Sequence, residues 1–198
     1  GNALTGHPGI GKISFTGSTA AGAAIMENIA RSGIKPMTLE LGGKSPQLVF
    51  ADANLTLAAD CIARNILFNA GQACVAGSRV LVDARVAEAF TTALADRLKP
   101  GRIGPTWDAA TEYSPVISAR QIARIESLVN AAISEGAEVV TGATRLDHPG
   151  YFYAPTLLTG VSQTNTAVTE EIFGPVLTLQ TFTTEEEALT LADHPIYG

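Results

Sequence analysis

Stretches typical of strands and stretches typical of helices alternate along almost the whole chain, and this alternation restricts the fold more than any other feature. Runs rich in β-branched residues are followed by segments whose apolar residues recur three or four positions apart, the spacing of one helix face. A helix is the usual connection between parallel strands. We therefore expect an α/β fold with a parallel or mixed sheet flanked by helices. The expected strands are 12–16, 36–41, 47–50, 79–82, 138–141, 155–159 and 175–182.

Two pairs of residues predict where helices begin. Ser118 with Gln121, and Thr184 with Glu187, have the spacing of a capping box, in which each side chain accepts from the backbone N–H of the other residue. The helix that Ser118 opens has one apolar face, which we expect to be buried. The residues of that face are Ile122, Ile125, Val129 and Ile133.

The composition excludes several classes of protein. Hydrophobic residues make up 46% of the chain and the mean hydropathy is +0.20, values typical of a packed globular protein rather than a disordered one. A net charge of −6 argues against a nucleic-acid partner. No apolar run approaches the roughly 20 residues that a membrane span needs. The two cysteines, Cys61 and Cys74, form neither a disulfide framework nor a metal-ligand pattern, so we expect no metal and a cytoplasmic location.

Cys74 is the candidate nucleophile. It follows the expected helix 54–68 in a loop of Gly, Ala and Ser, where small neighbours leave its sulfur room for a substrate carbon. A thiol in such a place can be a nucleophile if another group takes its proton. A lone cysteine is more often a small packed residue, and this alternative suits Cys61, which lies within the helix.

A second candidate site lies where the strand 12–16 meets the next helix. Gly17 ends the strand and Ser18 can cap the helix, so that free backbone N–H groups and the helix dipole favour a phosphate. The stretch has Ser18 and Thr19 where a dinucleotide fingerprint has its second glycine, so a capped helix without a ligand is the alternative.

Four stretches, taken together and in this order, resemble the signature motifs of the aldehyde dehydrogenase superfamily. They are 15–22 (FTGSTAAG), 39–46 (LELGGKSP), 68–79 (FNAGQACVAGSR) and 170–176 (EEIFGPV). The resemblance covers essentially the whole chain and implies an aldehyde dehydrogenase-like α/β fold.

The same resemblance implies how the chain is organised. Residues 1–42 are expected to be the tail end of the cofactor-binding domain and residues 43–198 the catalytic, thiol-bearing domain. Full-length members of the family carry a large cofactor-binding portion before the first motif and an assembly strand after the last. The chain is therefore expected to be incomplete at both ends and inactive by itself.

The resemblance also implies a non-acylating reaction with NAD or NADP. The Cys74 thiolate would add to an aldehyde, and Glu40 would act as the base that activates water to release the product. The presence of Glu40 favours water as the final acceptor. The expected substrate is a small-molecule aldehyde, and the parent protein is expected to be a homo-oligomer.

Seven residues are the expected cofactor contacts. Glu171 would contact ribose hydroxyls and Phe173 the nicotinamide, and on a strand-like stretch the two would share a face. Lys44, which follows a pair of glycines, is expected to be structural. The full set of expected contacts is Thr16, Gly17, Ser18, Leu41, Gly42, Glu171 and Phe173.

Two other functions remain open at the level of sequence. Cys74 could serve a cofactor-independent thiol esterase or hydrolase, or the chain could be a catalytically inert piece of a dehydrogenase. Reduction of a nicotinamide cofactor by an aldehyde would separate the dehydrogenase from the esterase.

Overall fold

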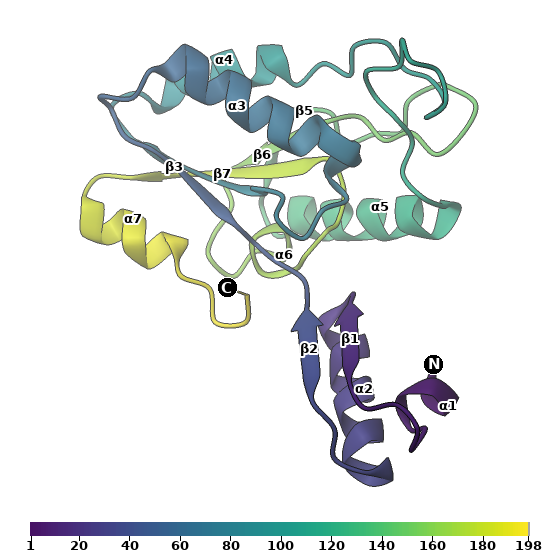
Figure 1. Cartoon of the computed structure of the whole chain (residues 1–198). Coiled ribbons are helices and arrows are strands. Elements are labelled where there is room, and N and C mark those ends of the chain that lie inside the picture. Colours follow the sequence, from purple (N-terminus) through teal and green to yellow (C-terminus); the bar gives the residue numbers. More distant parts are fainter. Residues whose placement is uncertain (198) are drawn as a thin grey trace. The chain divides into compact units, whose positions relative to one another are not determined.

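The structure, a computed structural model, describes residues 1–197. The chain forms two compact units, Gly1–Gly42 and Gly43–Gly198 (Figure 1). The boundary falls between two adjacent glycines. Each unit is described by itself below.

Unit 1 contains two helices and a two-stranded parallel sheet. Its elements are α1 (Asn2–Thr5), β1 (Ile13–Thr16), α2 (Thr19–Ser32) and β2 (Met37–Glu40). β1 pairs with β2, and α2 is the crossover between them, as the alternation predicts. The Ser18 side chain caps α2 by accepting from the Ala21 N–H at 3.3 Å, which confirms the predicted cap.

Unit 2 is built on a five-stranded sheet in the order β3-β4-β7-β6-β5. All neighbouring strands are parallel except β5, which is antiparallel to β6, so the predicted parallel or mixed sheet is confirmed as mixed. The central strands β4 and β7 are the most buried. The five strands of this sheet are β3 (Pro46–Val49), β4 (Arg79–Asp83), β5 (Glu138–Thr141), β6 (Thr156–Thr159) and β7 (Val176–Phe182).

Helices cover both faces of this sheet (Figure 1). α3 and α4 pack on one face, where Val80 and Val82 of β4 join their apolar residues. The intervening Leu81 points to the opposite face and packs with α7, because successive side chains of a strand alternate. The helices are α3 (Leu55–Leu67), the 3-10 helix η1 (Phe68–Gly71), α4 (Ala87–Arg97), α5 (Ala119–Ser134), α6 (Thr166–Thr169) and α7 (Glu185–Ala192).

Two predictions about α5 are wrong in detail. Ile133 is 38% exposed, and Ala132 occupies the buried position instead, because the 3.6-residue period carries the buried face one residue earlier there. Ser118 accepts from the Gln121 N–H at 3.2 Å, but the Gln121 side chain does not complete the capping box. Its amide donates to backbone carbonyls of Ile172 and Phe173 instead.

The prediction that Cys61 is packed is also wrong. Cys61 is exposed, whereas Ile62, Ala63 and Ile66 of the same helix are buried against the sheet. The helix periodicity places Cys61 on the solvent-facing side of α3.

Candidate active site

The backbone of the Cys74 loop takes an unusual path before the cysteine. Asn69, Ala70 and Gly71 all have positive φ angles, of 51°, 50° and 71°, and such values cost a non-glycine residue free energy unless other contacts fix them. Side-chain bonds provide that support. The Asn69 amide donates to the Gln72 carbonyl at 2.8 Å, and the Gln72 amide donates back to the Asn69 carbonyl at 3.0 Å. Two reciprocal hydrogen bonds thus hold the turn that precedes Cys74.

The loop is also held after the cysteine. Asn65 of α3 accepts from the Gly77 N–H at 2.7 Å, and the side chain of Gln47 on β3 donates to the Gly77 carbonyl at 2.6 Å. Cys74 itself is partly exposed. A half-buried thiol between two anchored ends has the fixed position that a nucleophile requires.

Gly43 is the point at which three of the predicted segments meet. A Cβ added to Gly43 would lie 2.3 Å from the Cys74 carbonyl oxygen, so only glycine allows this approach. The Gly43 N–H donates to Glu171 Oε1 at 3.2 Å. A similar close contact joins the Cys74 loop directly to the segment that precedes β7, because a Cβ on Gly71 would lie 2.1 Å from the Gly174 carbonyl oxygen. A small cavity of about 10 Å³ lies among these segments.

The expected strand-like geometry of Glu171 and Phe173 is wrong. The segment between α6 and β7 is irregular, and Phe173 has φ +55°, in the left-handed region. The chain must turn here before β7 begins at Val176, so the two side chains do not alternate as on a strand. Glu171 is half-buried, while the Phe173 side chain is partly exposed, at 38%.

Lys44, expected to be structural, occupies the interior of unit 2. It is 2% exposed, and burial, followed by the charge of Arg79, lowers its pKa to about 7, against the opposing effect of Glu171 and Glu170. A charged side chain this deeply buried is unusual without a function or a partner.

Arg79 is equally buried and ties three elements together. Its Nε donates to the Lys44 carbonyl at 2.7 Å, and its two terminal nitrogens donate to the carbonyls of Leu191 and Ala192 at 2.7 and 2.6 Å. The last carbonyls of a helix have no intrahelical partner. Arg79, on the strand that follows the Cys74 loop, therefore satisfies the C-terminal end of α7.

Unit 1 gathers the remaining expected residues at one end of its sheet. Thr16 ends β1 directly opposite Glu40, which ends β2. The Gly17 N–H donates to the Glu40 carbonyl at 3.0 Å. Glu40 is exposed. The Leu41 side chain packs over Gly22 of α2, where an added Cβ would lie 2.8 Å from it. Gly42 closes the unit.

The start of α2, where the phosphates of the cofactor are expected, has free backbone donors. Ser18 satisfies the N–H of Ala21, and in the part of the chain that the structure describes the N–H groups of Thr19 and Ala20 have no partner, as expected for the first turn of a helix. These free donors and the helix dipole are complementary to an anion.

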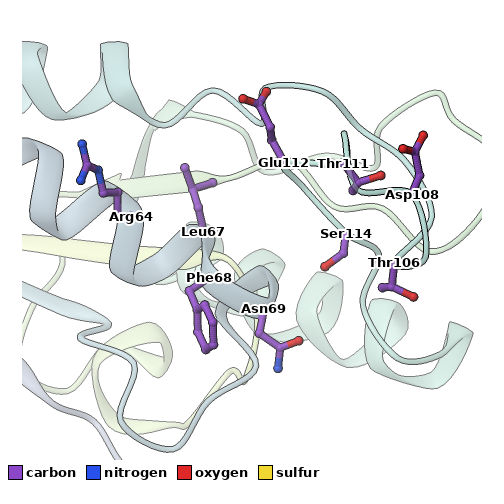
Figure 2. A pocket seen from close by; sticks show the side chains of 9 residues that line it. All are labelled: Arg64, Leu67, Phe68, Asn69, Thr106, Asp108, Thr111, Glu112 and Ser114. Atoms are coloured by element: carbon purple, nitrogen blue, oxygen red, sulfur yellow. The ribbon is translucent and has the colours of Figure 1, made fainter.

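A larger cavity of about 460 Å³ borders the turn before Cys74. Figure 2 shows side chains from the end of α3 and from the loop 100–115 around it. None of the expected site residues lines it. Its lining consists of Arg64, Leu67, Phe68, Asn69, Thr106, Asp108, Thr111, Glu112 and Ser114.

Within residues 1–197, no group of three or more His, Cys, Asp or Glu side chains is placed to hold a metal ion. None of the described helices is both long enough and apolar enough to cross a membrane.

Comparison with protein families decides the identity of the chain. Residues 1–198, the entire length of the chain, match the aldehyde dehydrogenase family. The chain belongs to the aldehyde dehydrogenase family. The family resemblance predicted from the four motifs is therefore confirmed.

Relatives within the family are similar along the whole chain. The chain is 42% identical over 202 residues to betaine aldehyde dehydrogenase of Bacillus subtilis, and 40% identical over 198 residues to retinal dehydrogenase 2 of Gallus gallus. All of this chain is covered in both cases. It spans 41% of the length of the first relative and 38% of the second.

Solved structures of the family share the fold. Betaine aldehyde dehydrogenase from Staphylococcus aureus, in complex with NAD+, has a TM-score of 0.92 and 41% identity. The match covers 96% of this chain and 39% of that one. The predicted aldehyde dehydrogenase-like α/β fold is thus confirmed.

Within each unit, the structure brings together part of the expected site. Cys74, Glu171 and Phe173 lie in unit 2, where Gly43 links the first two, and the other expected residues lie in unit 1. The chemical roles of these residues stay predictions. The sequence does not predict Arg79 as a buried anchor, although Arg79 ends the stretch 68–79. It also does not predict Gln121 as a bridge to the Phe173 loop, because the spacing of Gln121 from Ser118 indicates a capping box.

Proposed function

We propose that the whole protein oxidises an aldehyde to a carboxylic acid with NAD or NADP, using Cys74 as nucleophile and Glu40 as base. Family membership and 42% identity to a betaine aldehyde dehydrogenase support the reaction class. The NAD+ complex of a relative supports NAD as the first cofactor to test. A cytoplasmic, homo-oligomeric enzyme without a nucleic-acid partner belongs to the same proposal.

The observation that carries the proposal is the junction at Gly43. This residue packs against the Cys74 carbonyl and donates to the Glu171 carboxylate. A thiol and a candidate cofactor-binding carboxylate are thereby fixed to the same backbone segment. An esterase that uses no cofactor has no need for the second of these contacts.

The reaction follows from the chemistry of the two catalytic candidates. The Cys74 thiolate adds to the aldehyde carbon, and the backbone N–H of Cys74 is a candidate donor to the oxyanion that forms. NAD, when bound, would supply the acceptor for the hydride of that carbon, and Cys74 would then hold the acyl group as a thioester. Glu40 then takes a proton from water, the hydroxide oxygen bonds to the thioester carbon, and the carbon–sulfur bond breaks to release the acid and the thiolate.

Other residues of the chain would hold the cofactor. The free N–H groups at the start of α2, beside Ser18, suit its phosphates. Gly43 orients one oxygen of Glu171, and the second oxygen, which has no donor among the described residues, can accept from ribose hydroxyls. The exposed part of the Phe173 ring can pack against the nicotinamide.

The nucleophile is tested in the full-length protein with a matched pair of variants. Cys74→Ser is expected to lower aldehyde-dependent reduction of NAD by more than about a thousandfold, whereas Cys61→Ser, on the exposed face of α3, leaves it unchanged. Absorbance of the reduced nicotinamide, with betaine aldehyde and retinal as first substrates, measures both. Ester cleavage that depends on Cys74, without any NAD reduction, would favour the thiol esterase instead.

The base is tested by Glu40→Gln. This variant still forms the thioester, since the amide affects mainly the activation of water. We expect a normal first burst of reduced cofactor followed by a steady state slower by about 10²-fold or more. A variant that turns over at the wild-type rate across the pH range would remove Glu40 from the mechanism.

A further inference from the structure

Gln121 does not play the part that its position in the sequence suggests. It stands three residues after the helix cap Ser118, where a capping-box side chain would turn back to the cap. Its amide instead donates across unit 2 to the carbonyls of Ile172, at 3.1 Å, and Phe173, at 2.8 Å. The Ser118 side chain therefore caps the helix without the reciprocal bond from Gln121.

The two carbonyls that Gln121 binds lie on either side of Phe173. One belongs to the peptide group before that residue and the other to the peptide group after it, so together they fix both backbone rotations of Phe173. Those rotations place Phe173 at φ +55°, a left-handed conformation that persists only where the surroundings impose it. The bonds from Gln121 supply that constraint.

Arg124 extends the same contact by one turn of α5. Its terminal nitrogen donates to the Glu171 carbonyl at 2.9 Å, and positions three apart lie on the same face of a helix. Three consecutive carbonyls, from Glu171 to Phe173, therefore receive hydrogen bonds from one face of α5.

We propose that Gln121 is a positioning residue for the cofactor side of the active site. By fixing the two peptide groups around Phe173, it sets the direction of the Phe173 ring and, with Arg124, the place of the Glu171 carboxylate. The proposal rests on the proposed function in one respect, which is that Glu171 and Phe173 contact the nicotinamide half of NAD.

The replacement Gln121→Glu tests this arrangement most directly. The new carboxylate has nearly the same shape, but it has no hydrogen to donate and faces two carbonyl oxygens. Asn130→Asp is the matched control, because it makes the same change from amide to carboxylate at an exposed position of the same helix.

The experiment uses the full-length protein and three measurements. They are the KM for NAD, the cofactor-free hydrolysis of a small ester by Cys74, and hydrogen exchange of the backbone amides of residues 170–175 without NAD. For Gln121→Glu we expect the KM for NAD to rise about tenfold, faster exchange in this segment, and unchanged ester hydrolysis. Asn130→Asp should match the wild type in all three.

A pH series adds a signature that a general loss of structure would not produce. When the introduced carboxyl is protonated, it regains one donor. The ratio of the KM for NAD of Gln121→Glu to that of the wild type should therefore fall as the pH approaches about 4.3, the usual pKa of a glutamic acid. The ratio for Asn130→Asp should stay constant.

Each contrary result identifies what fails. Wild-type values for both exchange and KM in Gln121→Glu would overturn the proposal, as would an equal loss of ester hydrolysis, which would indicate a purely structural role. Faster exchange with an unchanged KM for NAD would also overturn it, through the assigned cofactor role of Glu171 and Phe173. A wild-type protein that hydrolyses esters but never reduces NAD would refute the proposed function itself.

Discussion

Lys44 is a lysine that unit 2 holds in its interior with a pKa near neutrality. Its motif position, after two glycines, gave no reason to expect this. Burial and the positive charge of Arg79 disfavour its protonated form, and the nearby Glu171 and Glu170 offset only part of that effect. The balance among these groups makes the stability of unit 2 depend on pH through Lys44.

The sign of that dependence follows from linkage. An unfolded chain binds the lysine proton up to about pH 10.4, whereas the folded protein loses it near pH 7. Between these values the unfolded state binds more protons, so the free energy of unfolding rises with pH, by at most about 1.4 kcal/mol per pH unit. The contribution is fully present above the unfolded pKa and is lost as the pH falls through about 7.

Lys44→Met should remove this slope. Urea unfolding from pH 7 to pH 10 is expected to give a smaller rise in stability for Lys44→Met than for the wild type. Lys99→Met is the matched control, because Lys99 is exposed on the surface beside Asp96. If the curves of Lys44→Met and the wild type run parallel, Lys44 is not the titrating group.

Residues of the site differ in how far the sequence could predict them. Gly43, Cys74 and Glu171 stand inside the stretches that resemble family motifs, and glycine at 43 and 71 is explained by the contacts that leave no room for a Cβ. The two carbonyls that Gln121 binds could not be predicted, because they lie 51 and 52 residues away in the chain and the contact depends on the packing of α5.

At the scale of elements, the observed strands and helices lie close to the ranges expected from the sequence, because each depends mainly on its own residues. Periodicity and caps predict α2, α3 and α5 without reference to the rest of the chain. The end of α7 is different. Its last carbonyls are bound by Arg79, which lies 112 and 113 residues earlier in the chain, and no local pattern indicates such a partner.

The two strands of unit 1 should be the least stable elements of the 198-residue chain. A two-stranded sheet is only marginally stable, and the buried apolar side chains of residues 1–42 are those of Ile13 and Ile29. β4 and β7, by contrast, lie in the centre of a five-stranded sheet covered by helices on both faces. Elements with few buried contacts open most readily.

Hydrogen exchange on the 198-residue chain checks this difference. Amides of β1 and β2 are expected to exchange well before those of β4 and β7, at the same pH and temperature. Equal protection in both units would mean that residues 1–42 are stabilised by more than the contacts within unit 1.

At the scale of the whole molecule, the chain distributes its predicted chemistry over two units. The expected base, Glu40, and the expected phosphate-binding turn belong to unit 1, and the expected nucleophile, Cys74, and the expected nicotinamide contacts belong to unit 2. The sequence predicts both sets because each lies in a short motif. It could not predict the irregular segment around Phe173, where the backbone is set by contacts with α5 rather than by strand propensity.

The glycine contacts of unit 2 bear on how this enzyme family can be re-engineered. The Cys74 loop touches its neighbours through bare backbone, at Gly43 against Cys74 and at Gly71 against Gly174. A loop transplanted from a relative with a different path would collide with main chain, which cannot rotate away as a side chain can. Segments 43–47, 68–79 and 170–175 should therefore be exchanged together or left in place.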